Sequence, residues 1–249
     1  MNDSPFSLQD KVILVTGASS GIGRATAVLC SELGATVVLC GRNVARLNDA
    51  HASLAGDGHV VIPGDLTDAN ARHALVDALP PLDGAVFSAG IAALVPMRMV
   101  SEQHLHTMFS VNYEAPVMLT QRLLAKKKIN GDASLVFVSA RAEHISPSAT
   151  GIYAGVKAAL TATVRTIALE NAKRGIRANC VSPGYVGTPM LENLQGTSSL
   201  DLDFAPLGLI SATDVANSIA FLLTPASRWV TRSSLVIDAG LSLRARGAV

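Results

Sequence analysis

The chain is poor in charge, in aromatic rings and in cysteine. Of its 249 residues only 16% are charged and 4% aromatic, whereas 49% are hydrophobic. This composition excludes a disordered chain, which buries too little apolar surface to offset the entropy of ordering. The formal net charge of +1 leaves no basic field that would attract nucleic acid. The one basic run, at 126–128, is typical of a solvated helix end.

No two of the three cysteines form a CxxC pair. Cys30, Cys40 and Cys180 each stand in an apolar segment, which predicts buried reduced thiols rather than a disulfide framework or a metal site. The N-terminus shows no apolar core of a signal peptide, and no charge-free stretch of about twenty apolar residues occurs. We therefore expect a cytoplasmic protein that binds no metal and does not span a membrane.

Short apolar segments alternate with helical patterns along nearly the whole chain. Solid apolar strands separated by helices form parallel sheets covered on both faces. The pattern predicts a single α/β domain over 1–249 with a doubly wound, Rossmann-like sheet of about seven strands. The aperiodic segment 183–211 is predicted to be a flap over the substrate. The expected strands lie at 11–16, 35–40, 59–67, 83–90, 133–140, 176–184 and 233–240, and the expected helices at 21–34, 43–56, 67–79, 101–128, 151–175 and 212–224.

Three glycines follow the first expected strand, in the stretch TGASSGIG. Gly17, Gly21 and Gly23 stand between a strand and a helix, where glycine permits a tight turn and lets the backbone approach a pyrophosphate. The start of the helix then offers free N–H groups to the phosphates. The pattern predicts a dinucleotide site, although its spacing is G-x-x-x-G-x-G rather than G-x-G-x-x-G.

The end of the second expected strand indicates which dinucleotide binds. In NAD sites an acid at this place holds the ribose 2′-hydroxyl, but the strand here ends in VVLCGRN. Arg42 would pair with a 2′-phosphate, which an acid would repel. The sequence therefore favours NADP(H) over NAD(H), and the alternative is that Arg42 is a solvated residue at a helix start.

Tyr153 and Lys157 lie four residues apart on an expected helix and so share one face. A free tyrosine has a pKa of about 10, too high for efficient acid–base work at neutral pH, and a nearby ammonium lowers it. The pair could exchange a proton with a carbonyl or alcohol oxygen. Such a pair alone is more often structural, but its place after the fifth strand of a nucleotide-binding fold favours catalysis.

Five stretches together resemble the short-chain dehydrogenase/reductase family in its compact single-domain form. They are TGASSGIG, GDL at 64–66, VN at 111–112, YAGVK at 153–157 and SPGYVGTPM at 182–190. The resemblance covers nearly the whole chain. It implies that the protein interconverts a carbonyl and an alcohol of a small-molecule substrate by hydride transfer with the nicotinamide cofactor, and that it assembles as a homotetramer or homodimer.

The resemblance also implies a role for each matched residue. Tyr153 would be the acid/base and Lys157 would tune it, while Asn112 would disturb its helix and hold a water of a proton relay. Asp65 would contact the adenine, and packing and a hydroxyl from 186–188 would position the nicotinamide amide. The expected cofactor contacts are Gly17, Ser19, Ser20, Gly21, Ile22, Gly23, Arg42, Asn43, Asp65, Leu66, Ser88, Ala89, Gly90, Tyr153, Lys157, Pro183, Gly184, Val186 and Thr188.

Three departures from the family pattern stand out. Ser88 replaces an asparagine at the end of the fourth strand, and Thr231-Arg232 stands where Thr-Gly is frequent. The family's spacing places its catalytic serine at Ala140. We predict that Ser139 takes this role of stabilising the substrate oxygen. The alternatives are another donor among Ser146, Ser148 and His144, or loss of the role.

Polar residues Arg141, Glu143 and His144 follow this serine and suggest a polar substrate, unless they only form a solvated rim. Two other functions remain open. A cofactor-binding regulatory protein with little catalysis is favoured slightly by the serine ambiguity and by Ser88. A sugar-nucleotide epimerase or dehydratase is disfavoured by the chain length and the glycine spacing.

Overall fold

A seven-stranded parallel sheet forms the centre of the protein, which a computed structural model describes over residues 4–195 and 205–243. The strand order is β3-β2-β1-β4-β5-β6-β7, so the chain winds outward in both directions from β1 and β4. This order confirms the predicted doubly wound sheet. The strands are β1 (Val12–Thr16), β2 (Thr36–Gly41), β3 (Val60–Pro63), β4 (Leu82–Phe87), β5 (Ile129–Val138), β6 (Arg177–Pro183) and β7 (Ser234–Ile237).

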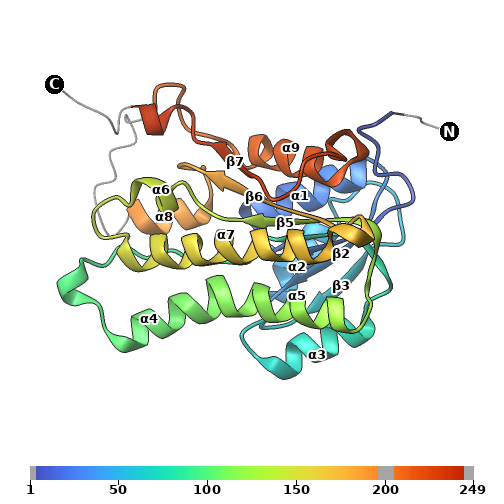
Figure 1. Ribbon diagram of the computed structural model, residues 1–249, viewed down its shortest axis with the longest axis horizontal. Coiled ribbons are helices and arrows are strands. Elements are labelled where there is room, and N and C mark those ends of the chain that lie inside the picture. Colours follow the sequence, from blue (N-terminus) through green and yellow to red (C-terminus); the bar gives the residue numbers. More distant parts are fainter. Residues whose placement is uncertain (1–3, 196–204, 244–249) are drawn as a thin grey trace.

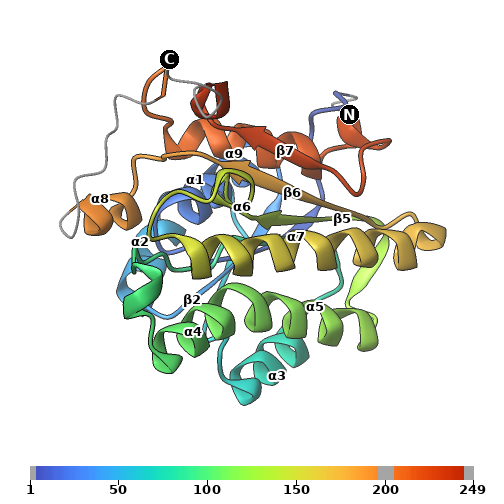
Figure 2. The ribbon, with the colours of Figure 1, turned by 60° about the vertical axis from the view of Figure 1, so that its left-hand side comes forward.

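Helices cover both faces of the sheet, as Figures 1 and 2 show. The first face carries α3 (Ala69–Ala78), α5 (Ala115–Ala125) and α7 (Gly151–Asn171), and the two long helices α5 and α7 lie side by side. The opposite face carries α1 (Gly21–Glu32), α2 (Val44–His51) and α9 (Ala212–Leu223). Shorter pieces are α4 (Glu102–Phe109), α6 (Ala142–Ile145), α8 (Pro189–Gln195), and the 3₁₀ turns Met97–Met99, Ala172–Arg174, Pro225–Ser227 and Leu241–Leu243.

Side chains of the central strands alternate between two hydrophobic cores. Leu14 of β1 packs into the core under α5 and α7, whereas Ile13 and Val15 pack into the core under α1 and α9. Strands buried on both faces are apolar at most positions, which explains their largely apolar segments in the sequence. The stretch from α7 to the next 3₁₀ turn is apolar and long enough to cross a membrane. In this fold Leu160 and Val164 instead pack it against the sheet.

The structure differs from the expected elements in three places. The expected helix 101–128 consists of α4, a π-helical turn at Ser110–Glu114 and α5. A helical turn, α6, follows β5 where a loop was expected. The predicted flap at 183–211 contains α8 and a bridge between Val186 and Ile210, and its part at 196–204 lies outside the described residues.

The three cysteines are buried and free, as predicted. Burial raises the pKa of Cys30, Cys40 and Cys180 to about 12, so all three stay protonated at neutral pH. They act as small apolar side chains of the core.

Candidate active site

One cavity of about 360 Å³ opens at the carboxyl ends of the central strands. Open α/β sheets bind their ligands at this edge, and the volume lies in the range of small-molecule sites. Of the residues predicted for catalysis and cofactor binding, all line this cavity except Gly23 and Asn43. Residues that are far apart in the sequence are thus gathered into one site.

Gly23 and Asn43 do not line the cavity but stabilise the helices next to it. A Cβ at Gly23 would lie 2.3 Å from the carbonyl oxygen of Gly17, so glycine is required for α1 to pack on the turn. The side-chain oxygen of Asn43 accepts a hydrogen bond from the backbone N–H of Arg46 at 3.0 Å and caps α2.

The glycine turn holds the ends of β1 and β4 close together. Gly17 has a φ of 68°, and a Cβ there would lie 2.8 Å from the backbone nitrogen of Ala89. The hydroxyl of Thr16 accepts hydrogen bonds from the backbone N–H groups of Ser88, at 3.1 Å, and Ala89, at 3.3 Å. The chain after β4 is therefore held close to the glycine turn, and Ser88, Ala89 and Gly90 line the cavity.

The start of α1 is suited to phosphate. Its N-cap residue, Ser20, makes no side-chain capping bond, and the first turn of the helix holds no acid. The N–H groups of this turn are left for an external acceptor, and the helix dipole favours an anion there. This geometry fits the diphosphate of a dinucleotide.

Arg42 and Asp65 also line the cavity. Arg42 directly follows β2, and the residues that end this strand include no acid. Asp65 accepts hydrogen bonds from the backbone N–H and the hydroxyl of Thr67, at 3.0 and 2.8 Å. These bonds, the backbone one foremost, and the positive charge of Arg42 lower the pKa of Asp65.

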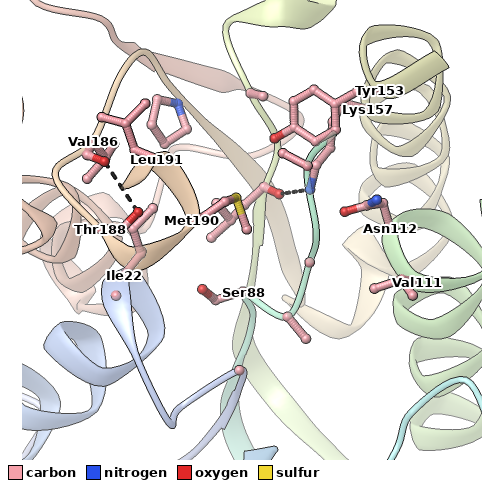
Figure 3. Close-up of a pocket in the computed structure, with 18 of the residues that line it drawn as sticks. Ile22, Ser88, Val111, Asn112, Tyr153, Lys157, Val186, Thr188, Met190 and Leu191 are labelled. Carbon is pink, nitrogen blue, oxygen red and sulfur yellow. Dashed lines mark hydrogen bonds between the residues drawn. The ribbon is translucent and has the colours of Figure 1, made fainter. Parts of the chain in front are cut away.

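Tyr153, Lys157 and Asn112 lie together on one side of the cavity, and Thr188 and Met190 lie across it (Figure 3). Lys157 Nζ donates a hydrogen bond to the carbonyl of Val138 at 2.8 Å and lies 5.8 Å from the centroid of the Tyr153 ring.

Burial sets the proton affinities of this pair. It lowers the pKa of Lys157 to about 8. Burial, and after it the negative charge of Glu143, raises the pKa of Tyr153. At neutral pH the tyrosine is therefore a phenol. The expectation that Lys157 lowers the pKa of Tyr153 is wrong for this structure, because burial and the charge of Glu143 raise it.

Asn112 sits in the π-helical turn and is fully buried. Its side-chain N–H donates to the carbonyl of Met108 at 3.0 Å, and its side-chain oxygen accepts from the backbone N–H of Ile91 at 3.1 Å. The predicted disturbance of the helix is thus present, as a π-turn. The bond from Ile91 ties the chain after β4 to this helix, and a Cβ at Gly90 would lie 2.9 Å from the Asn112 oxygen.

The hydroxyl of Ser139 is engaged with Glu143. It donates to Glu143 Oε2 at 2.7 Å and lies 3.1 Å from the hydroxyl of Thr161. A hydroxyl has one proton, so donation to a substrate would break its bond to the carboxylate. The predicted role of Ser139 at the substrate oxygen stays a prediction. Among the alternatives Ser148 lines the cavity, and Ala140 lines it with a methyl group.

The polar residues after Ser139 are bonded to protein partners. Arg141 Nε pairs with Asp238 Oδ2 at 3.1 Å, and His144 Nε2 lies 3.0 Å from Glu143 Oε1. The geometry therefore gives no support to a polar substrate based on these residues. An apolar wall completes the cavity, and sequence reasoning missed it because it combines three separate segments. Its residues include Ala92, Leu94, Ile145, Pro147, Met190 and Leu194.

The fold and this cavity define a dinucleotide-binding protein of the doubly wound α/β class. Residues 17–242 match a family model described as enoyl-(acyl carrier protein) reductase. A tropinone reductase homologue of Arabidopsis thaliana is 31% identical over 97% of this chain and 96% of its own length. The D-erythrulose reductase of Gallus gallus is 32% identical, over 94% and 97%.

A solved structure described as a short chain dehydrogenase/reductase family protein superposes with a TM-score of 0.86. It is 31% identical to this protein, over 95% of this chain and 99% of the other. The chain belongs to the short-chain dehydrogenase/reductase family of oxidoreductases, whose members typically bind a nicotinamide cofactor.

Proposed function

We propose that the protein is an NADP(H)-dependent oxidoreductase that interconverts a carbonyl and an alcohol, with Tyr153 as the acid/base. The observation that carries this proposal is the meeting of Tyr153, Lys157 and Asn112 in the cavity that also holds the glycine turn. The bound cofactor would supply or accept the hydride.

Side chains of the protein would transfer the proton. In reduction, the hydroxyl of Tyr153 donates its proton to the carbonyl oxygen, and the ammonium of Lys157 stabilises the phenolate that is left. Asn112, which lies near Lys157, would take part in the relay that returns a proton from solvent. In oxidation the same groups act in reverse. Tyr153→Phe should lower turnover by about 10²–10⁴-fold while the affinity for NADPH stays unchanged.

The preference for NADP(H) rests on Arg42 at the end of β2, where no acid competes. Loss of a charged hydrogen-bonding partner costs about 10–100-fold in affinity. We expect Arg42→Ala to weaken NADPH binding by this factor and to leave NADH binding within about twofold, as measured by calorimetry. Tighter binding of NADH than of NADPH by the unaltered protein would refute the preference.

The apolar wall indicates the substrate class. Ile145, Met190 and Leu194 line the cavity and carry no charge that could pair with a substrate. We propose a carbonyl compound with a bulky apolar group. NADPH oxidation with matched apolar and hydroxylated ketones tests this, and selective reduction of the hydroxylated ones would contradict it.

A second candidate is a cofactor-binding regulatory protein with little catalysis. It is favoured by the bond between Ser139 and Glu143, which leaves a methyl group at Ala140 toward the cavity. NADPH binding of micromolar affinity without reduction of any carbonyl in the panel would select this candidate.

We also propose a homo-oligomer that pairs through α5 and α7. The outer side of α7 presents small residues, Gly155, Ala158 and Ala162, and α5 presents the partly exposed Met118. Sedimentation should show a dimer or tetramer that Ala158→Arg dissociates, and a monomer at every concentration would refute it.

A further inference from the structure

Glu143, in the short helix α6, carries a carboxylate buried among hydroxyl groups. Its side chain is 2% exposed. Oxygen Oε2 accepts from the hydroxyls of Ser139 and Thr161, and Oε1 accepts from Ser182 at 2.9 Å. Oε1 also lies 3.5 Å from the hydroxyl of Ser234 and 3.0 Å from His144 Nε2.

Each of these partners can donate a hydrogen bond to the carboxylate. Such a set of donors suits an ionised carboxylate, because burial of a bare charge costs several kcal/mol. No other role of Glu143 in the chemistry follows from the family pattern, and the side chain does not line the cavity. Because the protein interior has a low dielectric, a buried charge changes the proton affinities of neighbouring acid–base groups more strongly than it would in water.

The network ties α7 to three strands. Thr161 lies one turn after Lys157 on α7, Ser139 follows β5, and Ser182 and Ser234 belong to β6 and β7. The hydroxyl of Ser139 also lies 3.4 Å from the backbone carbonyl of Lys157. Glu143 therefore joins the α7 segment that carries Lys157 to the strand end whose carbonyl accepts from Lys157 Nζ.

We propose that Glu143 is a positioning residue of the acid–base site, holding this segment of α7 in place and keeping Lys157 in its ammonium form. The consequences for turnover rest on the proposed function, whereas the effect on Lys157 does not.

The charges around Lys157 agree with this assignment. The titratable groups that face it are Tyr153 on α7, Cys180 on β6 and Glu143 on α6, and the polar Asn112 lies nearby. The raised pKa values of Tyr153 and Cys180 keep both groups neutral at neutral pH. Glu143 is then the anion that favours the ammonium against the effect of burial.

Two variants separate charge from structure. Glu143→Gln removes the charge but keeps the size and one acceptor oxygen, and its new N–H groups can donate to the surrounding hydroxyls. The control, Ser182→Ala, removes one donor to the carboxylate and keeps the charge. If Glu143→Gln does not fold, Glu143→Met removes the same charge without needing hydrogen bonds, and carries the same expectation.

The readout is the titration of Lys157 by NMR of protein labelled with ¹³C at lysine Cε. The chain has only six lysines, and Lys157→Met identifies the signal. We expect a midpoint near pH 8 in the unaltered protein. The midpoint should fall by about one pH unit in Glu143→Gln and stay within about 0.3 units in Ser182→Ala. An unchanged midpoint in the charge-removing variants would overturn the proposal.

The kinetic consequence is separate. In Glu143→Gln a one-unit fall of the Lys157 midpoint from about pH 8 leaves about half of this lysine charged at pH 7. The kcat for carbonyl reduction should therefore fall about twofold at pH 7 and about fivefold at pH 8, with the KM for NADPH unchanged. A shifted Lys157 midpoint without carbonyl reduction in any form of the protein would refute the proposed function and leave the role of Glu143 intact.

Discussion

Gly23→Ala should damage both the stability and the cofactor site. A Cβ at this position would lie 2.3 Å from the oxygen and 2.7 Å from the carbon of the Gly17 carbonyl, and 3.2 Å from the nitrogen of Ala18. All three are backbone atoms of the glycine turn, so no side chain can rotate away. Ordinary contact needs about 1 Å more, and α1 must therefore move away from the turn.

The magnitude follows from two opposing effects. Overpacking a rigid site costs about 1–3 kcal/mol, and the backbone clash places this variant at the upper end. Alanine offsets about 1 kcal/mol of that cost through its better helix propensity. We expect a net loss of about 2 kcal/mol in the free energy of unfolding, or a fall in Tm of roughly 4–8 °C.

Urea unfolding followed by circular dichroism measures the loss, and NADPH titration should show weaker binding because the moved turn faces the phosphates. The matched control is Gly131→Ala in β5, whose added Cβ would lie 3.5 Å from the carbonyl oxygen of Arg174, an ordinary contact. An unfolding free energy for Gly23→Ala within about 0.5 kcal/mol of the unaltered protein, or an equal loss in the control, would refute the reasoning.

Four further predictions concern the acid–base end of the cavity. Burial lowers the pKa of Lys157 from 10.5 to about 8, so between these values the unfolded chain binds the additional proton. The unfolding free energy relative to Lys157→Met should therefore rise with pH across this window, by at most about 1.4 kcal/mol per unit, in urea titrations at several pH values. Ala140→Ser should raise turnover by up to about 10²-fold by adding a donor to the cavity wall. Ser139→Ala should chiefly lower stability, by about 1–3 kcal/mol, because it takes a donor from a buried carboxylate; a 10²-fold loss of turnover with unchanged stability would instead make Ser139 the oxygen donor. Gly90→Ala should cost about 1–3 kcal/mol, since the new Cβ would meet the Asn112 oxygen at 2.9 Å, and thermal unfolding at an unchanged Tm would contradict this.

Much of the fold could be predicted because its signals are local. The strands are short apolar segments, since both of their faces are buried, and the order of elements follows from their alternation with helices. The spacing of the glycines predicts their tight turn, and the spacing of Tyr153 and Lys157 predicts that both lie on one face of a helix. Asn112 could be recognised only through the resemblance, and the π-turn around it explains why its helix pattern is interrupted.

The surroundings of Glu143 could not be predicted in the same way. Its partners Thr161, Ser182 and Ser234 lie 18, 39 and 91 residues away, on three different elements. Each is an ordinary polar residue in its own segment, and only the packing of α7 against β6 and β7 brings them together. The polar residues after β5 therefore suggested a polar pocket, although in the fold they form hydrogen bonds and ion pairs with other protein groups.

The stretch after β5 also changes what the reaction centre requires. Ser139 bonds to a charged acceptor, and its neighbour Ala140 lines the cavity with a methyl group. Under the proposed function, Tyr153 gives the substrate oxygen its proton, and Ser148 is the other predicted donor that lines the cavity. The phenolate left on Tyr153 needs to be stabilised by a fully charged Lys157. Burial alone would bring the pKa of this lysine toward neutral pH. The buried charge of Glu143 opposes that loss at Lys157 but also raises the pKa of Tyr153, so its two effects on the acid–base pair act in opposite directions.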